Sequence, residues 1–147
     1  MIVTDYKLDR EVFLSDAFLK RKVNERAGKE DIEQYLDTKQ KEMNTILKES
    51  QSKLLNRIDD VALLAKGFKE KPFKLTLVMQ GSRDGFTASK FHKLCDGIPN
   101  TLSLFESNSG HLFGGFTSIP WSSPKSNKAI ADPHAWLFSM THDSIHP

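Results

Sequence analysis

The sequence contains a single cysteine, Cys95, among 147 residues, so an internal disulfide is excluded. It also lacks a long apolar run and an apolar N-terminal signal region, which argues against a transmembrane helix and a secretory leader. Acidic residues near the N-terminus, Asp5, Asp9 and Glu11, argue against a mitochondrial transit peptide. We therefore expect a cytoplasmic protein without a transmembrane segment.

An excess of charge of one sign is also missing. Twenty-one Lys and Arg residues stand against nineteen Asp and Glu residues, which leaves a net charge of +2. So small an excess gives no reason to expect nucleic acid as the partner. The hydrophobic content of 38%, with ten Phe residues, suffices for one domain or for a small domain with a helical extension.

Glycine and proline are absent between Lys29 and Lys66, where Lys, Glu, Gln, Asp and Leu dominate. This composition predicts one long helix over residues 29–66, which Gly67 and Pro72 end. In a heptad frame, part of the seam is apolar, at Leu36, Met43, Leu47, Leu54, Val61 and Leu64. We expect this stripe to contact another helix, through self-association or in a partner. The alternative is that it folds back on the globular part of the same chain.

The first 28 residues are predicted to form a short helical extension. Residues 1–9 show no clear period and are expected to be irregular. From Arg10 onward, Val12, Phe13, Ala17 and Phe18 fall on one helical face, which predicts a helix that Gly28 ends.

A β-rich region follows the long helix. Apolar residues alternate over residues 73–80, which predicts a half-buried strand. The stretch Gly81 to Gly85 predicts a turn, and Thr87 is placed to cap a short helix over residues 88–96 that Gly97 ends. We expect Phe86 and Phe91 to form a hydrophobic staple, with Leu94 beside them under the sheet.

Three further strands are predicted. Two lie around residues 102–105 and 112–116 and are joined by the short loop Asn108-Ser109-Gly110. Gly114 and Gly115 inside the second of these strands predict a bulge or a close backbone approach. A further strand is expected over residues 135–140, and residues 141–147 have little to hold them.

Candidate chemistry is sparse. His92 and Cys95 are three residues apart on the predicted helix, and His111 or His134 could complete a zinc site, but no second tightly spaced ligand pair supports one. Ser82, Asp84 and His111 could be combined into a triad, although backbone geometry already explains the turn that holds the first two. We predict no catalytic, cofactor-binding or metal-binding residue.

The region from residue 73 onward carries a resemblance. The run SRDGFTASKFHKLCDG, then PNTLSLFESNSGHLFGGF, then Pro120-Trp121 and Ala135 to Met140 resemble the TLDc domain family in order and spacing. The resemblance implies a two-sheet antiparallel β-sandwich with short helices. It also implies a non-enzymatic role in protection from oxidative damage and in binding the vacuolar-type proton ATPase. Family members continue well past the position of Met140, so the resemblance implies the N-terminal half of the domain.

The resemblance transfers no catalytic residue, only positions that define the fold: Asp84, Gly85, Phe91, Cys95, Gly114, Gly115 and Trp121. We therefore expect an α+β protein with three parts. Residues 1–28 form a helical extension, 29–71 a long coiled-coil-like helix and linker, and 72–147 a partial TLDc-like β-sandwich with a short helix. The expected function is a protein-interaction module. The alternative is a scaffold whose long helix docks into a coiled-coil or cytoskeletal, for example ciliary, assembly.

Overall fold

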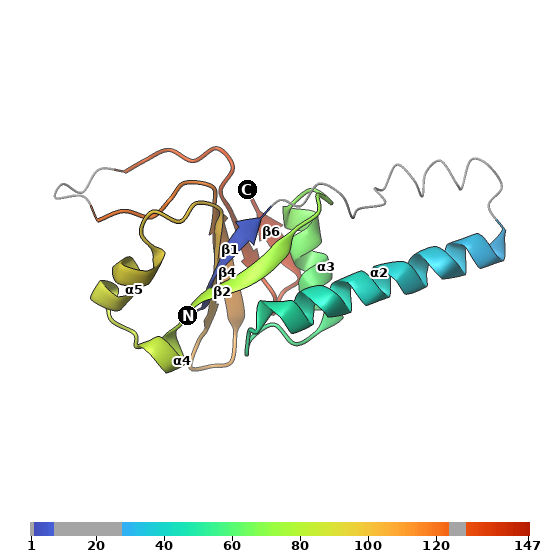
Figure 1. The fold of residues 1–147 in the computed structure, drawn as a ribbon, viewed down its shortest axis with the longest axis horizontal. Coiled ribbons are helices and arrows are strands. Elements are labelled where there is room, and N and C mark those ends of the chain that lie inside the picture. The colour runs from blue at the N-terminus through green and yellow to red at the C-terminus, as the bar shows by residue number, and fades with distance from the viewer. Residues whose placement is uncertain (1, 8–27, 124–128) are drawn as a thin grey trace.

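A computed structural model describes residues 2–7, 28–123 and 129–147 (Figure 1). Its centre is a six-stranded sheet with the order β2-β1-β3-β4-β5-β6, in which every neighbouring pair is antiparallel. The strands are β1 (Ile2–Lys7), β2 (Lys74–Gln80), β3 (Thr101–Glu106), β4 (Leu112–Thr117), β5 (Trp136–Ser139) and β6 (Ser144–His146). The helices of the described residues are α2 (Lys29–Ser50), α3 (Ile58–Gly67), α4 (Gly81–Asp84) and α5 (Ala88–Cys95). The predicted α+β class is confirmed, with α2 and α3 preceding all strands of the antiparallel sheet except β1.

The strand β1 corrects the expectation that residues 1–9 are irregular. It lies inside the sheet, between β2 and β3, with Asp5 opposite both Thr76 and Thr101. Its partner strands lie about seventy to a hundred residues away along the chain, so no local sequence pattern predicts this pairing. The helix predicted between Arg10 and Gly28 lies outside the described residues.

The single helix predicted over residues 29–66 is wrong: the structure divides it into α2 and α3, joined by residues 51–57. At the break Gln51 adopts a left-handed φ of 51°, and serine side chains bind nearby backbone groups in place of the helical ladder. Ser50 Oγ donates to the Leu47 carbonyl (2.8 Å), and Ser52 Oγ accepts from the Leu55 N–H (3.0 Å). Serines favour such local bonds over a helix interior.

Both helices pack on one face of the sheet (Figure 1). Val61, Leu63 and Leu64 of α3 are buried, together with sheet residues such as Leu75 and Leu104. One hydrophobic core therefore contains residues from both sides of position 72, where the sequence predicts a domain boundary. The division into 1–28, 29–71 and 72–147 remains a prediction, and the packing of the described residues does not separate the last two parts.

Most elements expected after residue 73 are confirmed. β2 to β5 lie where the sequence predicts strands, and α5 begins after Thr87, whose hydroxyl accepts a hydrogen bond from the Lys90 N–H (3.3 Å). Gly97, with a φ of 81°, follows the end of α5. Two details differ: residues 81–84 form the one-turn helix α4, and residues 144–146 form β6 by pairing with β5.

The second face of the sheet is only partly covered. α5 packs over the end of β2, where Cys95 and Met79 are fully buried with Phe91 against them. In the described part of the chain no second sheet lies on this face, so the structure shows one sheet of the expected sandwich. No described helix or second sheet covers the face over β3, β4 and β5.

Candidate interaction surfaces

The turn that carries Asp84 and Gly85 closes around a carboxylate. Asp84 accepts hydrogen bonds from the Gln80 N–H (2.8 Å) and from the guanidinium of Arg83 (2.8 Å). The Arg83 bond, with that of Gln80, lowers the pKa of Asp84 to about 2. Gly85 follows with a φ of 103°, a region that residues with a Cβ rarely adopt. These contacts are internal to the turn.

Phe91 and Trp121 pack edge to face, with ring centroids 5.0 Å apart. The indole N–H of Trp121 donates to Thr101 Oγ1 (2.8 Å), which ties the segment after β4 to the start of β3. Phe91 therefore finds Trp121 as its aromatic partner, whereas Phe86 is 75% exposed and lies over Gly81. Leu94, predicted to pack under the sheet, is on the exposed side of α5.

Cys95 and the histidines do not form a reactive cluster. Burial raises the pKa of the Cys95 thiol to about 11, and the Asp96 carboxylate adds to the rise. His92 Nδ1 lies 2.8 Å from Asp96 Oδ1, and Ser123 Oγ donates to Asp96 Oδ2 (2.6 Å). Among the described residues, no group of three His, Cys, Asp or Glu side chains could hold a metal ion.

The Ser82, Asp84 and His111 combination is not assembled either. Ser82 Oγ accepts from the Gln80 side-chain amide (2.7 Å), and Asp84 binds Arg83. His111 contacts Ser109 (2.8 Å) in the β3–β4 hairpin, so each member of the combination has a different partner.

Gly114 and Gly115 allow the close approach that their sequence position predicts. A Cβ at Gly114 would collide with the Ser103 carbonyl oxygen and with the Phe138 ring. A Cβ at Gly115 would lie 2.9 Å from the Leu137 side chain, on the opposite face of the sheet. The β3–β4 register runs without interruption, so the pair marks a close approach and not a bulge.

The first candidate surface is the uncovered face of β3, β4 and β5, which we call the open face. Leu137 is 64% exposed and Phe113 is 44% exposed, and the Phe113 ring stacks on Phe105 at 5.9 Å. Together with Trp121 they border a shallow hollow over Gly115 of about 550 Å³. No Asp, Glu, Lys or Arg side chain is among the described residues that line this hollow. An exposed apolar patch of this kind is typical of a protein-binding surface.

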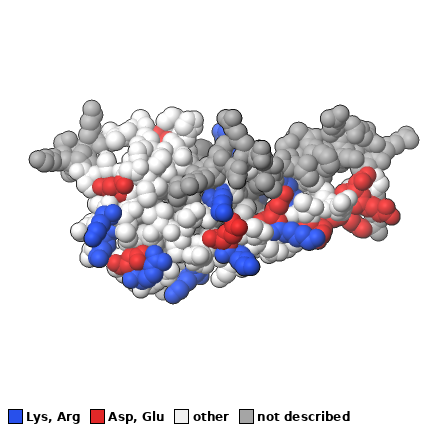
Figure 2. Space-filling model, viewed as in Figure 1, with Lys and Arg blue, Asp and Glu red and all other residues white. Residues whose placement is uncertain are grey.

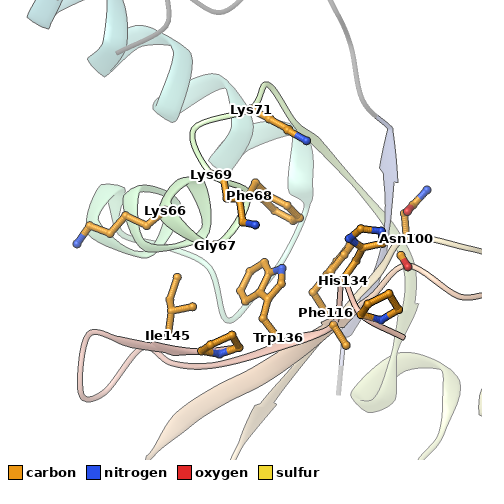
Figure 3. A pocket seen from close by; sticks show the side chains of 14 residues that line it. Lys66, Gly67, Phe68, Lys69, Lys71, Asn100, Phe116, His134, Trp136 and Ile145 are labelled. Carbon is orange, nitrogen blue, oxygen red and sulfur yellow. The ribbon is translucent and has the colours of Figure 1, made fainter. Parts of the chain in front are cut away.

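The second candidate surface is a pocket of about 490 Å³ at the end of α3, which we call the lysine pocket (Figure 3). Lys66, Lys69 and Lys71 stand on its rim. Phe68 and Trp136, whose rings meet edge to face at 5.2 Å, form part of its floor. Sequence reasoning missed this site because it read residues 67–72 only as the end of a helix. The signal was present in the three lysines around Gly67.

One carboxylate holds the wall of the lysine pocket in place. Asp132 accepts hydrogen bonds from Thr117 Oγ1, Ser118 N and Ser118 Oγ, each at 2.7 Å, and from His134 N at 3.0 Å. Burial alone would raise the pKa of Asp132, but these four hydrogen bonds outweigh it and hold the pKa well below its ordinary value. The segment before β5 is thereby fixed to the end of β4.

The predicted helix interface is largely turned inward. Val61 and Leu64 are buried in the core of this chain, and Met43, Leu47 and Leu54 pack against the same core. These five residues contact their own chain, as the fold-back alternative describes. Leu36 differs, since it is 58% exposed. It belongs to the first half of α2, and this end of the helix extends beyond the sheet (Figure 1).

Charge elsewhere is mixed. Figure 2 shows acidic and basic side chains interspersed over the visible face, including along α2. Several are paired, for example Lys41 with Asp37 (2.6 Å) and Lys74 with Glu49 (3.0 Å).

None of the described helices is both long enough and apolar enough to cross a membrane.

Residues 41–147 match the family model of the TLDc domain, which is well over half of the chain. The chain belongs to the TLDc domain family. No curated protein and no solved structure gives a significant match to it. The TLDc match begins inside α2, so the family domain includes α3 and the second half of α2 as well as the region after Phe73 that carries the visible motifs.

Proposed function

We propose that this TLDc chain is a non-enzymatic protein-interaction module that binds subunits of the vacuolar-type proton ATPase in the cytoplasm. Protection from oxidative damage would then follow from that binding and not from chemistry on this chain. The observation that carries the proposal is the open face. The face is uncharged and exposes Phe113 and Leu137, so its burial against a partner lowers the free energy and favours binding.

A redox enzyme is the weaker reading of the link to oxidative damage. The thiolate is the reactive form of cysteine, and a pKa of about 11 leaves Cys95 protonated at neutral pH. The Cys95 side chain is also fully buried, so a peroxide would have to open the contact with Met79 to reach it. Cys95→Ser should therefore leave any protective effect intact.

The test is binding of purified vacuolar-type ATPase subunits to the whole chain, measured by calorimetry. The double variant Phe113→Lys/Leu137→Lys places two charges on the open face without changing the core. Both side chains are partner-facing anchors in the proposal, so we expect a loss of affinity of at least about tenfold. Ile130→Lys is the matched control, because Ile130 is 62% exposed but is not among the residues that line the open face.

The alternative function, a scaffold that docks through its helix, rests on a different surface. Ile32 and Leu36 are four residues apart on α2 and are 39% and 58% exposed. This spacing places them on one face of the helix, where they could meet a coiled-coil or cytoskeletal, for example ciliary, partner. Ile32→Lys/Leu36→Lys should abolish that docking and leave ATPase binding unchanged. If the α2 variant loses docking to such a partner, and the open-face variant binds the ATPase subunits as the unchanged chain does, the scaffold function replaces the ATPase proposal.

A further inference from the structure

We propose that the lysine pocket binds an acidic peptide segment that carries one large apolar side chain. The site differs from the open face: the lysines lie at the end of α3, which packs on the other side of the sheet. The inference therefore goes beyond the proposed function and does not depend on the identity of the ATPase.

The charge of the rim selects the ligand class. Lys66, Lys69 and Lys71 line the pocket, and no Asp or Glu side chain is among the described residues that line it. Among the described residues, Lys66 Nζ lies 3.8 Å from Asp143 Oδ2, at the limit of an ion pair. Lys69 and Lys71 form no ion pair with another described residue. Two cations are thus available to carboxylates of a ligand.

The floor adds an apolar anchor point. Phe68, Phe116 and Trp136 form one aromatic cluster, with Phe68 edge to face against both other rings at 5.2 Å. A volume of about 490 Å³ lies in the range of small-ligand sites and suits one large side chain with its flanking backbone. The side chains of Asn100, Ser118 and His134 also line the pocket and can meet the polar backbone of a peptide.

The backbone turn after α3 places Lys69 at the rim of the pocket. Lys69 and Glu70 both have a φ of 55°, the left-handed region that favours glycine or asparagine. Two consecutive side-chain-bearing residues in this region cost stability, and here they close the C-terminus of α3: the Lys69 and Glu70 N–H groups donate to the Lys66 and Ala65 carbonyls (2.9 Å each). At residue 69 the structure keeps a lysine where glycine would be more stable, and that lysine faces the pocket (Figure 3).

The experiment is fluorescence anisotropy with the whole chain and a labelled peptide in which three glutamates flank a central leucine on each side. We expect saturable binding that weakens with added salt, because the rim charges are exposed to solvent. A peptide with alanine at the centre should bind more weakly, and one with lysines in place of the glutamates should not bind. No saturation at millimolar chain concentration would overturn the proposal.

Two pairs of variants locate the site. Lys69→Glu/Lys71→Glu should weaken the peptide at least about tenfold, while Lys93→Glu, an exposed lysine on α5, should change the affinity by less than about twofold. Lys69→Gly and Glu70→Gly both relieve a left-handed residue and should both raise the melting temperature. Only Lys69→Gly should weaken the peptide. Equal affinities in these two glycine variants would contradict a binding role for Lys69.

The outcome is separable from that of the proposed function. The open-face variant Phe113→Lys/Leu137→Lys should bind the acidic peptide as tightly as the unchanged chain does. Loss of peptide binding in that variant would overturn the assignment to the lysine pocket, whatever the ATPase measurement shows.

Discussion

The indole ring of Trp136 occupies the space that a side chain at residue 67 would need. A Cβ on Gly67 would collide with three carbon atoms of that ring, at the point where α3 meets β5. Gly67 was expected only to end a helix, but it also allows α3 to lie against the aromatic cluster of Phe68, Phe116 and Trp136.

Gly67→Ala should therefore destabilise the protein although alanine favours helices. Overpacking a core contact costs about 1–3 kcal/mol, more than the helix propensity gained. Chemical denaturation measures the loss in the free energy of unfolding. Near-ultraviolet circular dichroism reports a change in the packing of the aromatic rings, Trp136 among them. Gly28→Ala is the control, because nothing lies within 4 Å of a Cβ at Gly28. A Gly67→Ala variant as stable as the unchanged chain would contradict the packing described.

Asp132→Asn should remove a pH-dependent part of the stability. The hydrogen bonds from Thr117, Ser118 and His134 lower the folded-state pKa of Asp132, so the folded state favours the ionised carboxylate. That contribution is fully present above the unfolded pKa near 4 and is lost as the pH falls toward the folded pKa. We expect a loss of at least about 2 kcal/mol at neutral pH, because charged hydrogen bonds are replaced. Melting curves should stay apart from pH 7 down to about pH 4 and should begin to converge with those of the unchanged chain only as the pH falls from 4 to 3. Asp59→Asn is the control: it makes the same substitution at an exposed position and should cost much less stability at neutral pH.

Phe91→Ala should destabilise the second face of the sheet. Phe91 packs edge to face on Trp121 and against the buried pair Met79 and Cys95. Because Phe91 is half-buried, we expect about 2–3 kcal/mol, below the range for a fully buried Phe. Phe86→Ala is the control and should cost much less, since Phe86 is 75% exposed. Equal losses of stability in the two variants would contradict this packing and support the predicted staple of Phe86 on Phe91.

A fragment of residues 67–147 should not fold on its own. It lacks β1, which joins β2 to β3, and it lacks the α3 residues Val61 and Leu64 that bury Leu75 and Leu104. The fragment therefore exposes strand edges and an apolar face, which favour aggregation. Circular dichroism and sedimentation should show no cooperative transition and no stable monomer, in contrast to the whole chain. A sharp thermal transition in a monomeric fragment would contradict this packing.

The local elements were predictable from sequence because their causes lie within a few residues. Thr87 caps α5 through the Lys90 N–H three residues later, and Gly97 follows the helix with a positive φ. The β3–β4 hairpin follows from two strand-forming runs on either side of Gly110, which also has a positive φ. The TLDc family could likewise be recognised from the sequence, because its motifs lie at fixed spacings in one continuous region.

The helix break at residues 51–57 was not predicted although its determinants are local. Ser50 and Ser52 stand in a run without glycine or proline, and composition there favours a helix. Their hydroxyls instead bind backbone groups within three residues, and the turn lets α3 pack alongside α2 on the sheet. Helix propensity is weak beside the burial of Val61 and Leu64, so tertiary packing decides between the two conformations.

The sequence by itself determined the α+β class, the strands and helix between Lys74 and Ser139, and the family, because each depends on short-range patterns. Tertiary structure alone decided that β1 enters the sheet between β2 and β3, that the apolar stripe of α3 covers its own sheet, and that Lys69 and Lys71 stand over an aromatic floor. These features join residues far apart in the chain. They are stabilised by the burial of apolar surface between distant segments, and this burial cannot be inferred from any short stretch of the sequence.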